Sequence, residues 1–161
     1  MRRLLSALAA FALAWVAIVT SPGTAAAAGT PRAQFWDATG YQSWKLDKDV
    51  WSQGYALIPD LSKEGLSCWF CSGNWDNRIS SLSTTGGGQS PVDLFVYTEK
   101  GYGGTCVHIP ANTQVSDVRD MIVSGIGYPI SLNNEISSFM VYDINRPVPD
   151  HPECHLLLSH L

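Results

Sequence analysis

The sequence predicts an all-β fold, a sandwich built of short strands. Three observations point to it. Helical periodicity is scarce, glycine and proline interrupt the chain at short intervals, and the apolar stretches between them are short. Short strands separated by turn signals are typical of a β-sandwich or barrel. At 161 residues the chain has the size of one ordinary domain, or of two very small ones.

Composition and charge exclude two classes of protein. The net charge is −4, and only 15% of the residues are charged. A protein that binds nucleic acid by neutralising phosphates needs a basic surface, so no nucleic-acid partner is expected. After residue 28 no apolar run is long enough to span a bilayer, so no membrane partner is expected for that part.

The first 28 residues read as a secretory signal peptide. Arg2 and Arg3 precede an apolar stretch at 4–20, and an alanine run follows at 25–28. A positive end, an apolar stretch and small residues at a cleavage site form such a signal. The alternative is a retained anchor, since the apolar stretch lies at the lower edge of spanning length. We therefore expect an extracellular protein, with a net charge of −6 once the two arginines are removed. Residues 29–40 are expected to be an N-terminal extension.

Beyond this extension, strands are predicted at 55–58, 94–97, 105–109 and 138–142, which are rich in β-branched and aromatic residues. A helical turn is predicted at 112–121, with Val115 and Val118 on one face. Residues 83–90 contain serine, threonine and glycine and read as a loop or short linker. This loop divides the chain after residue 28 into two similar lengths.

Four cysteines lie after residue 28. An even number in an exported chain favours disulfides, and four cysteines allow three connectivities. One hypothesis pairs Cys106 with Cys154 and Cys68 with Cys71. Because Cys68 and Cys71 form a C-x-x-C pair, a redox motif or half of a zinc site is the alternative.

The two halves contain a repeat. Residues 76–82 read Asp-Asn-Arg-Ile-Ser-Ser-Leu, and residues 133–139, 57 positions later, read Asn-Asn-Glu-Ile-Ser-Ser-Phe. Upstream of the second copy, Tyr97 and Tyr102 precede a strand that ends at Pro110. The corresponding pair in the first half is expected to be Leu46 and Trp51, before a strand that ends at Pro59. On this alignment the second half has about six extra residues, placed at 121–130.

The repeated loop carries aspartate, asparagine and serine, which supply hard oxygen donors and no sulfur or imidazole. Such donors suit Ca²⁺, which takes six to eight oxygens, whereas transition metals favour histidine or cysteine. One short loop cannot complete such a shell, but two facing loops with water could. The alternative is a pair of plain turns, because the same residue types are turn formers.

The doubled loop pattern [N/D]-[N/D]-x-x-[S/T]-S, together with Tyr97-x4-Tyr102-x-Gly104, resembles the microbial βγ-crystallin domain. The resemblance covers residues 41–143, with one key at 41–85, the second at 92–143 and a tail at 144–161. It implies a sandwich of two interlocked Greek keys. In the first half Leu46 stands where the family prefers an aromatic residue, and Gln53 where it prefers glycine.

The resemblance also implies two Ca²⁺ sites, each shared between the loops. Their oxygens would come from Asp76, Asn77, Asn133, Asn134, Ser80 and Ser137, and from the carbonyls of Arg78 and Glu135. Of the four acid or amide positions only Asp76 is charged, so we expect weak binding, with a dissociation constant of about 10⁻⁴–10⁻³ M. The ion would mainly reinforce the fold.

No enzymatic motif stands out, since neither G-x-S-x-G nor H-E-x-x-H occurs. A non-enzymatic structural or binding role is therefore expected. Related folds also serve as metalloproteinase inhibitors and killer-toxin-like antimicrobials, which would use an exposed loop at 59–65 or 121–129. A third hypothesis is a cell-wall glycan binder that uses its tryptophans: Trp36, Trp44, Trp51, Trp69 and Trp75. His108 is expected to be an ordinary strand residue. The histidines around Cys154 are expected to lie in a proline-rich tail, with zinc binding as the alternative.

Overall fold

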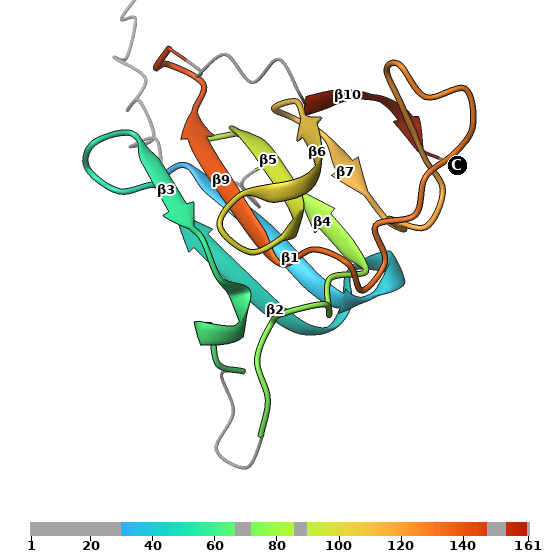
Figure 1. Cartoon of the computed structure of the whole chain (residues 1–161). Coiled ribbons are helices and arrows are strands. Elements are labelled where there is room, and N and C mark those ends of the chain that lie inside the picture. Colours follow the sequence, from blue (N-terminus) through green and yellow to red (C-terminus); the bar gives the residue numbers. More distant parts are fainter. Residues whose placement is uncertain (1–29, 67–71, 86–89, 148–153, 161) are drawn as a thin grey trace, which may run out of the picture.

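The computed structural model describes residues 30–66, 72–85, 90–147 and 154–160 (Figure 1). The expected signal peptide, Trp69 and the Cys68–Cys71 pair lie outside these residues. Within the described part, regular structure is almost entirely strand, with two short 3₁₀ turns, η1 (Thr39–Tyr41) and η2 (Leu61–Lys63). No helix in this part has the length and apolar character to cross a membrane. The all-β prediction is confirmed.

The strands form two sheets. The four-stranded sheet has the order β2-β1-β4-β7 and the six-stranded sheet the order β3-β9-β5-β6-β10-β8. Their bounds are β1 Arg32–Ala38, β2 Gln42–Asp49, β3 Tyr55–Ile58, β4 Ser81–Ser83, β5 Val92–Glu99, β6 Gly103–Ile109, β7 Gln114–Val115, β8 Met121–Val123, β9 Ser138–Asp143 and β10 Cys154–His160. The strands predicted at 55–58, 94–97, 105–109 and 138–142 are β3, β5, β6 and β9.

Two four-stranded units exchange their third strands. In the first unit β1, β2 and β4 share a sheet, but β3 pairs with β9 of the second unit. In the second unit β5, β6 and β9 share a sheet, while β7 pairs with β4 of the first. A fourth strand that returns beside the first is the mark of a Greek key. The chain is therefore a sandwich of two interlocked Greek keys, as the resemblance implied.

The core lies between the two sheets. Apolar side chains of both sheets form it, and Phe35 of β1 meets Phe139 of β9 with ring centroids 4.5 Å apart. Loop residues close the core, since Trp75, Ile79 and Ile136 are almost completely buried. Burial of large apolar side chains is the main favourable contribution to folding. Trp75 is therefore a core residue and not part of a binding surface.

The expected boundary at residue 41 is wrong, because residues 29–40 contain β1. This strand lies between β2 and β4, and Ala33 and Phe35 are fully buried in the core. The boundary was missed because β1 mixes apolar with polar residues: only Ala33, Phe35, Trp36 and Ala38 of its seven residues are apolar. The sandwich therefore begins at Arg32.

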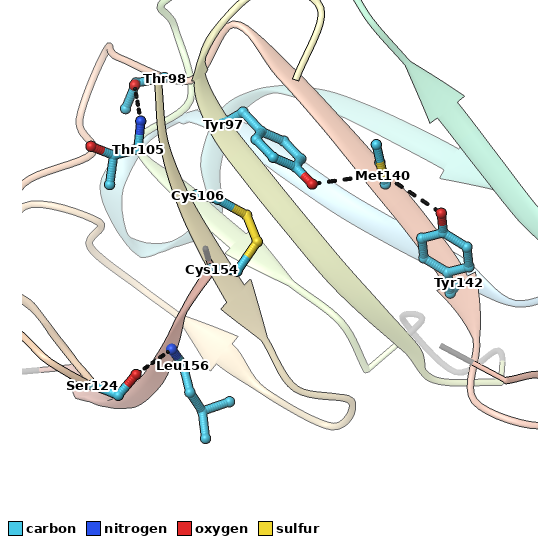
Figure 2. The surroundings of a disulfide bond; sticks show 9 residues. All are labelled: Tyr97, Thr98, Thr105, Cys106, Ser124, Met140, Tyr142, Cys154 and Leu156. Atoms are coloured by element: carbon cyan, nitrogen blue, oxygen red, sulfur yellow. Dashed lines mark hydrogen bonds between the residues drawn. A yellow bond between two sulfur atoms is a disulfide. The ribbon is translucent and has the colours of Figure 1, made fainter. Parts of the chain in front are cut away.

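The expected tail at 144–161 also contains structure. β10 pairs in parallel with β6 and antiparallel with β8, and a disulfide joins Cys106 to Cys154 (Figure 2). That half of the pairing hypothesis is confirmed. Because Cys154 is disulfide-bonded it cannot act as a zinc thiolate, and His155 contacts the Ser124 carbonyl through Nδ1 at 2.7 Å.

The helical turn expected at 112–121 is not formed. Val115 lies in β7 and pairs with Leu82, while the Val118 amide donates to the Ser80 carbonyl at 3.1 Å. Both valines are fully buried, but Val115 reaches the core from β7 and Val118 from a turn. Pairing with β4 supplies the backbone hydrogen bonds that a helix would otherwise have provided.

The first aromatic hairpin lies ten residues earlier than expected. Trp36 of β1 and Tyr41 pack edge to face at 5.1 Å, as Tyr97 and Tyr102 do at 5.6 Å in the β5–β6 hairpin. Equivalent residues of the two halves are separated by 61 positions in the hairpins, as Trp36 and Tyr97 are, but by 57 positions in the repeated loops, as Asp76 and Asn133 are. The extra residues therefore belong to the first half, between β2 and β3, and not to residues 121–130 of the second.

Candidate metal centre

The two repeated loops face each other across the approximate two-fold axis that relates the keys. The Asn77 amide donates to the Ile136 carbonyl at 3.1 Å, and the Asn134 amide donates to the Ile79 carbonyl at 3.3 Å. These reciprocal bonds place the start of each loop beside the end of the other. All eight residues expected at the metal sites belong to this pair of loops, as a shared-loop site requires.

The last serine of each loop pattern holds a hairpin corner. The Ser81 hydroxyl donates to the Ala38 carbonyl at 2.7 Å and accepts from the Tyr41 amide at 3.2 Å. Ser138 makes the corresponding bonds to Glu99 and Tyr102, at 2.6 and 3.1 Å. Both serines are fully buried, so their hydroxyls satisfy backbone groups that water cannot reach. These serines are structural, and the preceding position carries the hydroxyl available to an ion.

Oxygen atoms gather at one end of the paired loops. The Ser137 hydroxyl of the second loop donates to Asn77 Oδ1 of the first at 3.0 Å. Beside them Asp76 directs Oδ2 toward Lys100, whereas its Oδ1 is buried and has no hydrogen-bond partner in the structure. An unsatisfied buried carboxylate oxygen is costly. We refer to Asp76, Asn77 and Ser137 as the Asp76 end.

Lys100, in the turn between β5 and β6, places its ammonium at the Asp76 end. Nζ lies 3.2 Å from Asp76 Oδ2, 3.1 Å from Asp60 Oδ1 and 2.9 Å from Ser62 Oγ. Hydrogen bonds to Asp60 and then Asp76 raise the pKa of Lys100 above its ordinary value. The Ser62 hydroxyl, and then Lys100, lower the pKa of Asp60. The chain thus places a cation where two carboxylates converge.

The other end of the paired loops has no such arrangement. Asn133 stands in place of Asp76, and Asn134 is exposed. Asp117, which corresponds to Asp60, is occupied by its neighbour Arg119 through several hydrogen bonds, and these lower the pKa of Asp117. We refer to Asn133, Asn134 and Ser80 as the Asn133 end. Its side-chain donors are neutral.

The side chains of Arg78 and Glu135, whose backbone carbonyls were expected to bind the ion, have different surroundings. The Arg78 guanidinium pairs with Asp37 of β1 at 2.8 Å, and the Glu135 side chain is exposed. Asp60, Ser62 and Lys100 were not among the expected site residues. They lie outside the repeated pattern, so only the packing of η2 and the β5–β6 turn against the first loop brings them to the Asp76 end.

The described residues contain no group of three or more His, Cys, Asp or Glu side chains placed to hold one metal ion. A transition-metal centre is therefore not formed in this part of the chain. The Asp76 end instead combines one carboxylate, one amide and one hydroxyl, with a second carboxylate beyond Lys100. These are hard oxygen donors, and their chemistry fits Ca²⁺ completed by backbone carbonyls and water.

The other residues considered from the sequence, His108 and the tryptophans, lie outside the paired loops. His108 stacks on Phe95 with ring centroids 4.4 Å apart, and its Nε2 lies 3.4 Å from Asp93 Oδ1. Its strand neighbour Cys106 is in the disulfide, so the two do not form a nucleophile–base pair. Among the described tryptophans, Trp44 and Trp51 are exposed.

No protein-family model matches the chain, and no curated protein matches it. Solved structures similar to it include βγ-crystallin domains. One comes from work on the evolution of the eye-lens βγ-crystallin domain fold, with 16% identity, coverage of 72% of this chain and 89% of that one, and a TM-score of 0.49. Another is the βγ-crystallin of Ciona intestinalis, with 15% identity, coverage of 67% and 95%, and a TM-score of 0.45. A third is a βγ-crystallin domain of Flavobacterium johnsoniae, with 15% identity, coverage of 71% and 98%, and a TM-score of 0.44.

Proposed function

We propose that this protein is a secreted, Ca²⁺-binding domain with a structural or binding role and no enzymatic activity. The observation that carries the proposal is the Asp76 end, where the chain holds a cation of its own between Asp60 and Asp76. A position that attracts an ammonium group has the negative potential that Ca²⁺ requires. The unpartnered Asp76 Oδ1 supports the same reading.

Asp76, Asn77 and Ser137 would supply the side-chain oxygens at this end. The carbonyl of Arg78 and water would complete the shell, because Ca²⁺ takes six to eight oxygens. A hydroxyl from one loop and an amide and a carboxylate from the other would make the ion a cross-link between the two keys. Its main effect would be to stabilise the sandwich.

Lys100 would compete with the ion. Its ammonium contacts Asp76 Oδ2 directly, so Ca²⁺ has to displace it before that oxygen becomes available. The lysine side chain is 48% exposed and can move into solvent. We infer that Lys100 weakens Ca²⁺ binding and keeps the empty site folded by neutralising the two carboxylates.

The Asn133 end would bind Ca²⁺ more weakly. Asn133, Asn134 and Ser80 carry no formal charge, and affinity for Ca²⁺ depends on the charge of the ligands. The protein would therefore fill one site well before the other, although the repeat makes the two loops look alike.

The test is the melting temperature of the purified protein in EDTA and in about 5 mM Ca²⁺. For a dissociation constant of about 10⁻⁴–10⁻³ M the ion adds about 1–2 kcal/mol of stability, a rise of several degrees. Asp76→Asn should abolish the rise, and Lys100→Met should enlarge it. Asp120→Asn is the matched control, because Asp120 is an exposed carboxylate that belongs to neither repeated loop. If neither the native protein nor Lys100→Met responds to Ca²⁺, the proposal is wrong.

A second candidate function, inhibition of an extracellular protease, is favoured by the loop between Met121 and Ile130. Two backbone hydrogen bonds between these residues, at 3.0 and 2.8 Å, close the loop at its base. Ser124 ties it to Leu156 of β10 at 2.7 Å (Figure 2), and Tyr128 is 70% exposed. A rigid loop with an exposed aromatic residue suits a protein partner.

The alternative loop at 59–65 is less suited to this role, because Leu61 is fully buried. Inhibition of a panel of metalloproteases, lost in Tyr128→Ala and retained in Trp51→Ala, would support the inhibitor function. No inhibition of any protease in the panel would count against it and leave the Ca²⁺ proposal unaffected.

A further inference from the structure

A hollow of about 370 Å³ lies at one end of the β3–β9 pair, away from the paired loops. Two turns form its rim, one before β3 and one after β9. The turns are joined because the Asp143 amide donates to the Gly54 carbonyl at 3.0 Å. This volume is within the range of small-molecule sites, which hold about 300–1,000 Å³.

Arg146 reaches across the rim. The stem of its side chain lies on the bare backbone of Gly54, where an added Cβ would come within 2.7 Å of Arg146 Cγ. Gly54 also has φ +93°, a conformation that favours glycine. The turn at Gly54 therefore leaves room for the arginine and directs it along the hollow.

The guanidinium of Arg146 has no carboxylate partner within the described part of the chain. Every other lysine and arginine there lies within 4.0 Å of an aspartate or glutamate oxygen. The nearby Asp143 carboxylate accepts instead from the Asn145 amide at 2.9 Å and does not line the hollow. In an acidic protein, one unpaired arginine beside a hollow marks a position suited to an anion.

The walls of the hollow are mainly apolar and aromatic. Tyr55 and Tyr142 lie with ring centroids 5.9 Å apart, and Leu57, Pro147 and the neutral side chain of Gln53 complete the lining. The Tyr142 hydroxyl is engaged, since it donates to Met140 Sδ at 3.6 Å (Figure 2). Tyr142 therefore offers its ring and not its hydroxyl, and a flat ligand can pack against the two aromatic rings.

The polar groups indicate the charge of the ligand. The Gly54 amide donates to the Trp51 carbonyl at 2.8 Å and the Arg146 amide to the Asp143 carbonyl at 2.9 Å, so neither is free for an anion. One guanidinium without backbone donors matches the single charge of a carboxylate better than the double charge of a phosphate. Its two parallel N–H groups fit a carboxylate in a bidentate pair.

We propose that this hollow binds a small carboxylic acid carried on a six-membered ring. Arg146 pairs with the carboxylate, and Tyr55 packs against the ring. An aromatic acid and a uronic acid share this chemistry. The site is independent of Ca²⁺, because none of its residues belongs to the paired loops.

The test is titration of the ¹⁵N-labelled purified protein with 4-hydroxybenzoate and, separately, with glucuronate. At least one should shift the amide signals of Gly54 and Tyr55, with a dissociation constant of about 1 mM or below, as expected for a ligand of about ten heavy atoms. A shift with only the first assigns the site to aromatic acids, and a shift with only the second assigns it to acidic sugars. Benzyl alcohol and glucose, which lack the carboxylate, should bind at least 10-fold more weakly.

Arg146→Gln should weaken binding at least 10-fold and leave the melting temperature unchanged, because its guanidinium has no carboxylate partner among the described residues. Arg119→Gln, which removes an arginine elsewhere, should bind like the native protein. The proposal is overturned if neither acid shifts these signals, if the neutral analogues bind equally well, or if Arg146→Gln binds as before.

Discussion

The corners of the β1–β2 and β5–β6 hairpins share a backbone skeleton but differ in chemistry. In each corner an aromatic pair packs edge to face, a glycine has positive φ, and a buried serine bonds the turn. The second corner carries Lys100, which contacts the first loop, and the first corner has Thr39 at the corresponding place. Backbone symmetry is thus retained where packing requires it, while the charges are concentrated at the Asp76 end.

The sheets differ as well. The sheet of the second key is extended by β10 and β8, and nothing corresponds to these strands in the four-stranded sheet. The comparison teaches that the interlocked keys impose a common framework of about four strands each, to which each half adds its own features. Four changes test how far the two halves are equivalent.

The largest effect is expected from Cys106→Ser combined with Cys154→Ser. The disulfide closes a sequence separation of 48 residues, so its loss should lower the free energy of unfolding by about 4 kcal/mol. Urea denaturation measures this loss. Hydrogen exchange should quicken in β10 and β8 and stay slow in β1 and β2. Equal acceleration in both sheets would show that β10 supports the whole sandwich.

Gly104→Ala should cost about 2–3 kcal/mol, measured by the same denaturation. Gly104 has φ +72°, and an added Cβ would lie 2.3 Å from Thr98 Oγ1, the atom that accepts the Thr105 amide. Gly40→Ala is the matched control in the first corner, because φ is similar there but no atom lies within 4 Å. It should cost less. Equal losses would mean that backbone strain alone decides the effect.

Alkaline pH should affect the second corner more than the first. Burial, and then the neighbouring Tyr142 and Tyr102, raise the pKa of Tyr97 to about 12 from an ordinary value of 10.0. The unfolded chain loses this proton first, so the contribution of Tyr97 is complete below pH 10 and disappears as the pH approaches 12.

Tyr97→Phe should therefore flatten the decline in stability between pH 10 and 12, as followed by thermal denaturation. Burial also raises the pKa of Tyr102 and Tyr142, and that of Tyr41 in the first corner, so some decline remains. Trp36 holds the corresponding position in the first corner and does not titrate. An unchanged slope in Tyr97→Phe would contradict the assignment.

The smallest effect is expected from Ser43→Gly. Ser43 corresponds to Gly104 and has φ 68°, which is unfavourable for a residue with a side chain. Glycine removes this backbone strain from the folded state, but it also raises the conformational entropy of the unfolded chain. The first effect is slightly larger, so we expect the free energy of unfolding to rise by about 0.5 kcal/mol. A loss of stability would show that the Ser43 side chain makes a favourable contact at the first corner.

The paired loops were predictable because their sequence pattern is local. The pattern of acid or amide and hydroxyl positions from Asp76 to Ser81 returns at Asn133 to Ser138, and oxygen donors are recognisable from residue type alone. That the loops face each other followed from their repetition. The strands β3, β5, β6 and β9 were predictable for a similar reason, since short stretches rich in β-branched and aromatic residues favour strands locally.

The first hairpin was misplaced because two stretches fit an apolar residue and an aromatic residue five positions apart. Leu46 with Trp51 and Trp36 with Tyr41 both satisfy that spacing, and local preference does not separate them. Ser81 does, since its hydroxyl bonds Ala38 and Tyr41 from a strand forty residues away. A contact between residues so far apart in the sequence cannot be recognised from the spacing within the hairpin itself.

Strand composition, turn residues and the repeated loop, all properties of neighbouring residues, were therefore enough to predict an all-β fold with oxygen-rich loops, while the two Greek keys were implied by the family resemblance. The place of Lys100 between Asp60 and Asp76, the addition of β10 to β6, and the hollow beside Arg146 depend on segments that are distant in the chain. Such contacts form only when the two sheets pack, because burial of the shared core, and not any local preference, brings those segments together.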